Sequence, residues 1–139
     1  MIEFHFKSDF VLESKTQYSD WITRIIMSEG FLAGELDYIF CSDDYLLSIN
    51  QDYLNHDTYT DIITFDYSDG KTLSGDIFIS TERVNENAKA YKVSLDEELL
   101  RVMSHGILHL MGFGDKTDEE RILMRSKEEE KIKLFHVEH

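Results

Sequence analysis

The sequence has few of the residues that mark several classes of protein. Its 139 residues include one cysteine and no proline. A single cysteine excludes an intramolecular disulfide framework, and Cys41, which lies in an apolar run, is expected to be a small buried strand residue. No apolar run reaches the roughly eighteen residues typical of a membrane span, and the first residues show no signal-peptide pattern. We therefore expect a cytoplasmic protein with no membrane partner.

Basic residues are also scarce. Fourteen Lys and Arg stand against 28 Asp and Glu, which gives a formal net charge of -14. Between Asp37 and Asp76 the only basic residue is Lys71. A surface of this charge repels nucleic-acid phosphates, so an RNA partner would have to be met at a local basic patch or through a metal ion. The more basic candidates for such a patch are Arg83, Lys89, Lys92 and Arg101.

Alternating and β-branched segments predict a small sheet. Asp69-Gly70 separates two of these segments, which favours an antiparallel hairpin. Apolar residues at helical spacing predict the intervening helices. The first is capped by Ser19 or Asp20, and its buried side carries Trp21, Ile22, Ile25, Ile26 and, at the end of the stripe, Met27. We predict one α+β domain over residues 1–139, with a mixed sheet of about four strands covered by helices and the last two helices packed together. The expected strands are 2–6, 34–41, 61–65 and 73–79, and the expected helices are 20–30, 42–54, 80–92, one from 94 through 109, and one capped by Asp118.

The densest group of metal-binding residue types is His105-Gly-Ile-Leu-His109-Leu-Met-Gly112-Phe-Gly-Asp115. On a helix, His105 and His109 lie on the same side, with about 5–6 Å between their Cβ atoms. Gly112 is expected to end that helix in a left-handed conformation, which would let the chain turn back and bring Asp115 to the same ion. Two histidines and one carboxylate leave a coordination position open, as in catalytic zinc sites.

The HxxxH spacing alone is equally compatible with ordinary surface or core histidines, and the Gly-x-x-Asp continuation favours a metal. Zinc is the expected cofactor, one ion per chain. The same ligand set also suits iron(II), and nickel(II) is a further alternative.

The stretch from His105 to Asp115 resembles the signature of the YbeY family, HGxLHLxGYDH. HGILHLMG matches at every fixed position, and Asp115 stands where the family has its third histidine. Residues 50–65 are similar to the family's NxxYRxxDxPTDVLSF, and residues 75–80 to its GDIxIS strand. The resemblance covers nearly the whole chain. It implies an α+β fold with a metal cleft between the histidine helix and the sheet, in which His105, His109 and Asp115 act through the metal.

The resemblance also implies a function. It predicts a metal-dependent endoribonuclease for single-stranded RNA that acts in rRNA maturation, including 16S rRNA 3′-end processing, and in ribosome quality control. The implied partners are an rRNA precursor and a ribosomal subunit.

Besides Asp115, two positions depart from the family pattern: Leu54 replaces an arginine associated with RNA cleavage, and Tyr59 replaces a proline. We consider Arg83 and His56 as substitute substrate-binding groups near the scissile phosphate, although His56 could equally be an exposed loop residue. Thr60, Asp61 and Ser104 are candidates to support the metal ligands. Their alternative use is in caps and strand-end hydrogen bonds.

The metal would act on a phosphodiester as a Lewis acid and lower the pKa of a bound water to as little as about 7. Alternatively it would only orient RNA whose own 2′-hydroxyl attacks. Two other functions remain open. A ribosome-assembly factor with little nuclease activity fits the missing arginine and the acidic charge. A metzincin-like metalloprotease fits the ligand spacing, but it requires a glutamate where this chain has Gly106.

Overall fold

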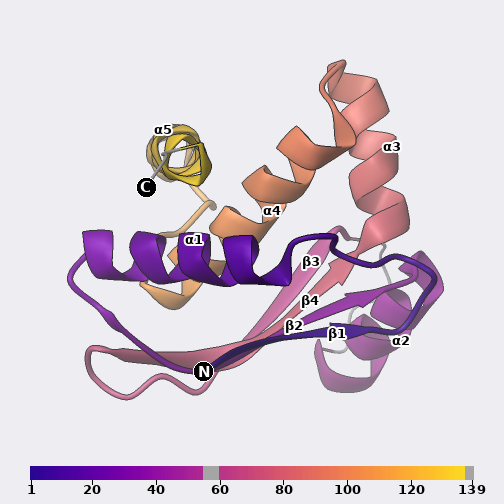
Figure 1. Ribbon diagram of the computed structural model, residues 1–139. Helices are drawn as coiled ribbons and strands as arrows, with labels where there is room; N and C mark the ends of the chain where they lie inside the picture. Colours follow the sequence, from indigo (N-terminus) through magenta and orange to yellow (C-terminus); the bar gives the residue numbers. More distant parts are fainter. Residues whose placement is uncertain (55–59, 137–139) are drawn as a thin grey trace.

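The computed structural model describes residues 1–54 and 60–136, whose path is shown in Figure 1. Strands and helices alternate irregularly along the chain, as expected for an α+β protein. The described elements are β1 (Ile2–Phe6), α1 (Lys15–Ser28), β2 (Leu32–Cys41), α2 (Asp43–Leu54), β3 (Ile62–Asp66), β4 (Thr72–Ser80), α3 (Thr81–Tyr91), α4 (Leu95–Leu110) and α5 (Asp118–Phe135).

The four strands form one mixed sheet in the order β1-β2-β4-β3. β1 and β4 both pair with β2 in parallel, and β3 pairs antiparallel with β4. The turn between β3 and β4 contains Gly70 with φ 59°, a left-handed conformation that glycine adopts without a steric penalty. The α+β class, the mixed four-stranded sheet and the β3–β4 hairpin confirm the prediction from the sequence.

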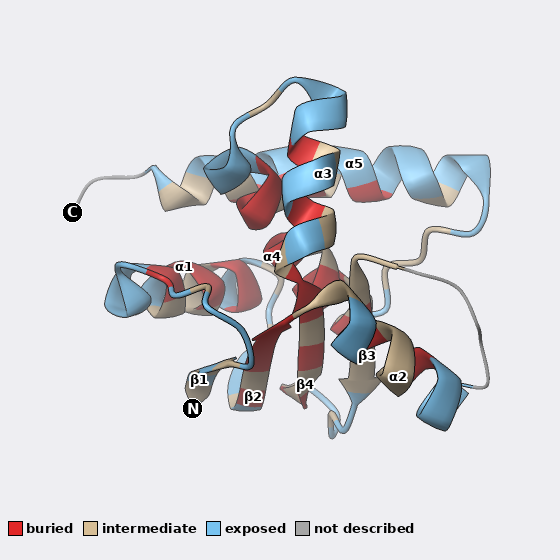
Figure 2. Ribbon diagram, turned by 90° about the vertical axis from the view of Figure 1, so that its right-hand side faces the viewer, coloured by how far each residue is buried: buried red, intermediate tan, exposed pale blue. Residues whose placement is uncertain are grey.

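Helices cover both faces of the sheet (Figure 1). On one face, α1 and α4 bury the main core together with alternate residues of β4, including Leu73, Ile77 and Ile79. On the other face, α2 covers a smaller cluster that contains Cys41 and Leu46. α5 packs outside α1 and α4, and α3 packs against α4, so that α4 is the most enclosed helix (Figure 2). The expected packing of the last two helices is confirmed.

Several details differ from the prediction, in addition to shifts of one or two residues at the ends of other elements. α1 begins at Lys15 instead of Asp20, because Tyr18 is buried against Trp21 and gives the first turn an apolar contact. Met27, expected on the buried side of α1, is 64% exposed. α5 is capped by Thr117 instead of Asp118, and the Thr117 hydroxyl and Glu120 carboxylate each accept a hydrogen bond from the other residue's N–H.

The single cysteine lies in β2 beneath α2. Cys41 is fully buried, as expected for a strand residue. Burial, with a smaller effect of the Asp43 charge, raises the pKa of the Cys41 thiol to about 12. Across residues 1–54 and 60–136, no helix combines the length and the apolar character needed to cross a bilayer.

Candidate metal centre

Helix α4 places the two histidines against the sheet. The Ser94 hydroxyl accepts the Glu97 N–H at 3.1 Å and fixes the start of α4. At Gly106, a Cβ atom would lie 2.9 Å from Cγ2 of Ile77 and 3.0 Å from Cδ1 of Ile62. At position 106 the helix therefore lies so close to the sheet that a larger residue would have to displace the Ile77 and Ile62 side chains.

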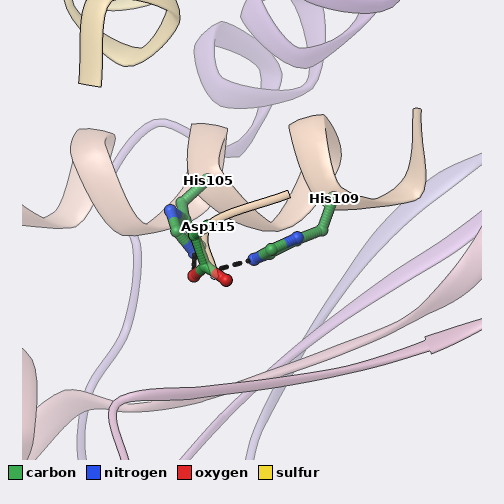
Figure 3. Close-up of side chains that lie close together, drawn as sticks. All are labelled: His105, His109 and Asp115. Carbon is green, nitrogen blue, oxygen red and sulfur yellow. Dashed lines mark ion pairs between the residues drawn. The ribbon is translucent and has the colours of Figure 1, made fainter. Parts of the chain in front are cut away.

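After α4 the chain reverses direction and passes back beside these histidines. Gly112 has φ 102° and donates its N–H to the His109 carbonyl at 3.0 Å. The Phe113 N–H reaches the Leu108 carbonyl at 3.1 Å, which completes the paired hydrogen bonds of a glycine-ended helix. The prediction that Gly112 ends the helix is confirmed. The reversal brings Asp115 beside both imidazole rings (Figure 3).

The three side chains converge on one point. Oδ2 of Asp115 lies 3.3 Å from Nε2 of His105 and 3.3 Å from Nε2 of His109. For bonds of about 2.0–2.1 Å, the ligand atoms of a tetrahedral zinc ion lie about 3.3 Å apart. All three ligand atoms are within 4.8 Å of one another. The residues therefore form a possible metal site, and their side chains, 20 to 41% exposed, leave one side open to a substrate.

Glu128 of α5 contacts the Nδ1 atom of His105, on the ring position that does not face Asp115. Its Oε2 lies 2.6 Å from Nδ1 of His105, and its Oε1 is 3.3 Å from Nη1 of Arg101. Glu128 is only 5% exposed. A carboxylate at Nδ1 favours the tautomer with its proton on that atom, which leaves Nε2 free to bind an ion. Sequence analysis missed this residue, although Met124 and Glu128 lie four apart on the buried side of α5.

Contacts with α1 hold α5 in the position from which Glu128 reaches His105. The Trp21 indole N–H donates to the Lys131 carbonyl at 2.7 Å. The Lys131 side chain is almost fully buried, and its Nζ lies 2.6 Å from the Glu29 carboxylate and 2.9 Å from the Ser28 hydroxyl. The position of Glu128 therefore depends on contacts about a hundred residues away in the sequence.

Opposing effects act on the ionisable groups around His105. Burial lowers the pKa of His105, but the hydrogen bond and charge of Glu128, with the charges of Asp115 and Asp61, outweigh it and raise the pKa above 6.5. Burial raises the pKa of Asp61, although the charges of His105 and Arg83 act in the opposite direction. The carboxylates around His105 therefore favour its protonated form.

The other predicted residues have different surroundings. Thr60 and Ser104 donate their hydroxyls to the carbonyls of Ile62 and Arg101, which is the alternative use considered for them. Arg83 lies 2.7 Å from the Asp43 carboxylate and 3.3 Å from that of Glu86, and its role in substrate binding stays a prediction. His56 lies outside the described residues.

Two cavities meet at the candidate metal site. The first, here called the α5-side cavity, has a volume of about 300 Å³ and is lined mainly by α4 and α5. The second, the α2-side cavity, has a volume of about 400 Å³, lies along β3, and includes Leu54 at the end of α2. The walls of both cavities include Asp61, Ile62, His105 and Asp115.

Comparisons with known proteins identify the family of the chain. The sequence profile of the family described as Endoribonuclease YbeY matches residues 3–136. A protein named endoribonuclease YbeY from Flavobacterium psychrophilum is 57% identical over 99% of this chain and 98% of its own length. A protein of the same name from Christiangramia forsetii is 58% identical over 99% of this chain and 96% of its own.

A solved structure shows the same fold. The solution structure of a Thermotoga maritima protein matches with a TM-score of 0.66 and 26% identity, covering 97% of this chain and 89% of the other. The profile match and the curated relatives extend over nearly the whole chain, including the candidate metal centre. The chain therefore belongs to the YbeY family, whose relatives carry the name endoribonuclease.

Proposed function

We propose that this protein is a metal-dependent endoribonuclease that cleaves single-stranded RNA at the centre formed by His105, His109 and Asp115. The observation that carries the proposal is the convergence of two imidazole Nε2 atoms on one Asp115 oxygen, at 3.3 Å each. Membership of the YbeY family supports the reaction class. The partly exposed ligands supply an open side at which a phosphodiester could bind.

Zinc is the ion that we propose, because two histidines and one carboxylate are among its common ligand sets; iron(II) and nickel(II) are alternatives. A bound divalent ion would supply Lewis-acid stabilisation of negative charge on a phosphodiester. Aspartate in place of the third histidine adds a negative charge, which makes the ion less electrophilic. Glu128 keeps the His105 ring in the orientation and tautomer that the site requires.

The resemblance to the family supports a role in rRNA maturation, including 16S rRNA 3′-end processing, and in ribosome quality control. The proposed partners are an rRNA precursor and a ribosomal subunit in the cytoplasm. Since the protein carries a net charge of -14, we expect RNA to be bound mainly near the metal and not over a broad surface.

A ribosome-assembly factor with little nuclease activity is the second candidate. One observation favours it. Leu54 lies in the wall of the α2-side cavity, where the family pattern places an arginine, and no lysine or arginine is among the described residues that line this cavity. A metzincin-like protease is less well supported, because the position of its catalytic glutamate is Gly106, which has no room for a larger side chain.

The test is to remove metal with a chelator, restore zinc and follow cleavage of a labelled single-stranded RNA. We expect cleavage only after zinc is restored, and none from His109→Ala. His5→Ala, which changes an exposed histidine on β1, is the matched control and should cleave normally. Cleavage by His109→Ala at the wild-type rate would contradict the proposal. Binding to ribosomal subunits without cleavage would favour the assembly factor, and hydrolysis of casein would favour the protease.

A further inference from the structure

Arginine side chains are gathered on one side of the candidate metal centre. The chain has five arginines, and three of them, Arg101, Arg121 and Arg125, line the α5-side cavity. Because His105 and Asp115 also line this cavity, a ligand inside it would lie beside the metal ligands. The volume of about 300 Å³ is at the lower end of the range of small-ligand sites.

These three arginines differ in how many of their N–H donors already have a partner within the protein. Arg101 pairs with Glu98 at 3.4 Å and with Glu128 at 3.3 Å, and its side chain is only 18% exposed. Arg121 pairs with Asp118 and donates to the Lys116 carbonyl at 2.8 Å.

Arg125 is exposed, and in residues 1–54 and 60–136 the structure shows no ion pair or side-chain hydrogen bond for it. A guanidinium group has five N–H donors in a planar fork that matches phosphate. Arg125 is therefore the arginine of this cavity whose donors have no hydrogen-bond partner within the described residues, although its charge acts on the nearby Glu98 carboxylate.

The charge of the cavity depends on the metal. Its wall contains three arginines and four carboxylates, those of Asp61, Glu98, Asp115 and Glu128. With all these groups ionised the net charge is minus one, and a divalent ion at the centre changes it to plus one. An anionic ligand is thus favoured when the ion is bound, although the rest of the molecule is strongly acidic.

We propose that the α5-side cavity binds a phosphate of the RNA chain next to the scissile phosphate, with Arg125 as the contact residue. This inference rests on the proposed nuclease function. No lysine or arginine is among the described residues that line the α2-side cavity, so the arginines beside the candidate metal ligands are those of the α5-side cavity. Arg125 acts by holding the strand, and the metal ligands remain intact without it.

The test uses zinc-loaded protein and a single-stranded 2′-O-methyl RNA, which lacks the free 2′-hydroxyl, with binding followed by fluorescence anisotropy over a range of salt concentrations. Loss of one phosphate contact on a single strand reduces the slope of log K against log salt by about 0.7. We expect this reduction for Arg125→Gln, and we expect Arg125→Lys to keep most of the wild-type slope. Lys133→Gln, at an exposed position in the last turn of α5, is the matched control and should keep the full slope.

An unchanged slope for Arg125→Gln would overturn the proposal, and so would an equal reduction for Arg125→Gln and Lys133→Gln, which would show only general attraction. Zinc content measured on each variant should equal that of the wild type, since Arg125 does not touch the ligands. If zinc-loaded wild-type protein cleaves RNA while the Arg125→Gln slope is unchanged, the phosphate site alone is wrong. If the zinc-loaded wild type neither binds nor cleaves RNA, the nuclease function is wrong as well.

Discussion

The two cavities that share His105 and Asp115 are built from different kinds of residue. Apart from Asp61 and the three candidate metal ligands, the α2-side cavity is lined by neutral residues, which include Asn50, Leu54 and residues of β3. The α5-side cavity has a charged wall in which buried carboxylates face arginines. In the site that we propose, α5 contributes in two ways: Glu128 supports a metal ligand, and Arg125 offers a cation. Four predictions test this division of roles.

The largest expected effect concerns the docking of α5. Glu29→Ala removes the carboxylate that faces the buried Lys131 ammonium group. Without Glu29, Lys131 keeps only the Ser28 hydroxyl and the more distant, exposed Glu130 carboxylate. Removing one partner of a buried ion pair costs about 3 kcal/mol when nothing replaces it, so we expect the free energy of unfolding in urea denaturation to fall by up to about that amount. Glu130→Ala, whose carboxylate is 58% exposed and 3.4 Å from the same lysine, is the control and should cost less than about 1 kcal/mol. Equal losses for the two variants would show that α5 is not anchored through Glu29.

The second effect concerns the support of His105. Glu128→Gln keeps a hydrogen-bond acceptor near Nδ1 but removes the charge. Loss of such supporting groups typically lowers metal affinity by about 10–100-fold, and we expect a change in this range when zinc is titrated against a competing chelator. The adjacent exposed Glu129 provides the control, since Glu129→Gln should bind zinc as the wild type does. Equal zinc affinity in all three proteins would remove Glu128 from the metal centre.

The third effect is a pH dependence. Burial alone would lower the pKa of His105, but Glu128, Asp115 and Asp61 raise it above 6.5 in the metal-free protein. Zinc binds the neutral imidazole, so protonation of His105 competes with zinc below this pKa. We expect this group to weaken the apparent zinc affinity by about tenfold for each further pH unit. In Glu128→Gln the pKa of His105 should fall, which moves the loss of affinity to lower pH; an identical pH profile in both proteins would contradict this.

The smallest expected effect is on the α2-side cavity. Leu54→Arg would place a cation in the neutral wall, and Leu54 is already 40% exposed, so the fold should tolerate the change. For a partly exposed charge a gain of up to about 1 kcal/mol is realistic, equivalent to about fivefold in kcat/KM for RNA cleavage. Tyr53→Arg adds the same charge one residue earlier, outside the described wall of the cavity, and should have less effect. Equal gains from both substitutions would indicate attraction by charge alone.

The sequence predicted those parts of the site that depend on local geometry. His105 and His109 face the same side because they lie four apart on one helix, and Gly112 returns Asp115 to them within six residues of His109. The first strand was predicted because Ile2, Phe4 and Phe6 alternate with polar residues, and β3 and β4 were predicted from β-branched and aromatic runs on either side of an Asp-Gly turn. These features need no knowledge of distant contacts.

The missed features depend on packing between distant segments. Glu128 and Lys131 lie in a run of charged residues that, considered alone, is typical of a solvated helix surface. They are buried because Glu29 and Arg101 supply charges of opposite sign from other helices. The early start of α1 has a related cause, since Tyr18 contacts Phe135 at the other end of the chain.

A parallel titration of metal content and RNA cleavage tests the metal-dependent nuclease most directly. Metal-free protein would receive increasing amounts of zinc, and bound zinc and the cleavage rate of a single-stranded RNA would be measured on the same samples. We expect the rate to rise in proportion to bound zinc and to level off at one ion per chain, with neither binding nor cleavage in His109→Ala. Cleavage by metal-free protein, or by His109→Ala at the wild-type rate, would contradict a metal-dependent reaction at this centre.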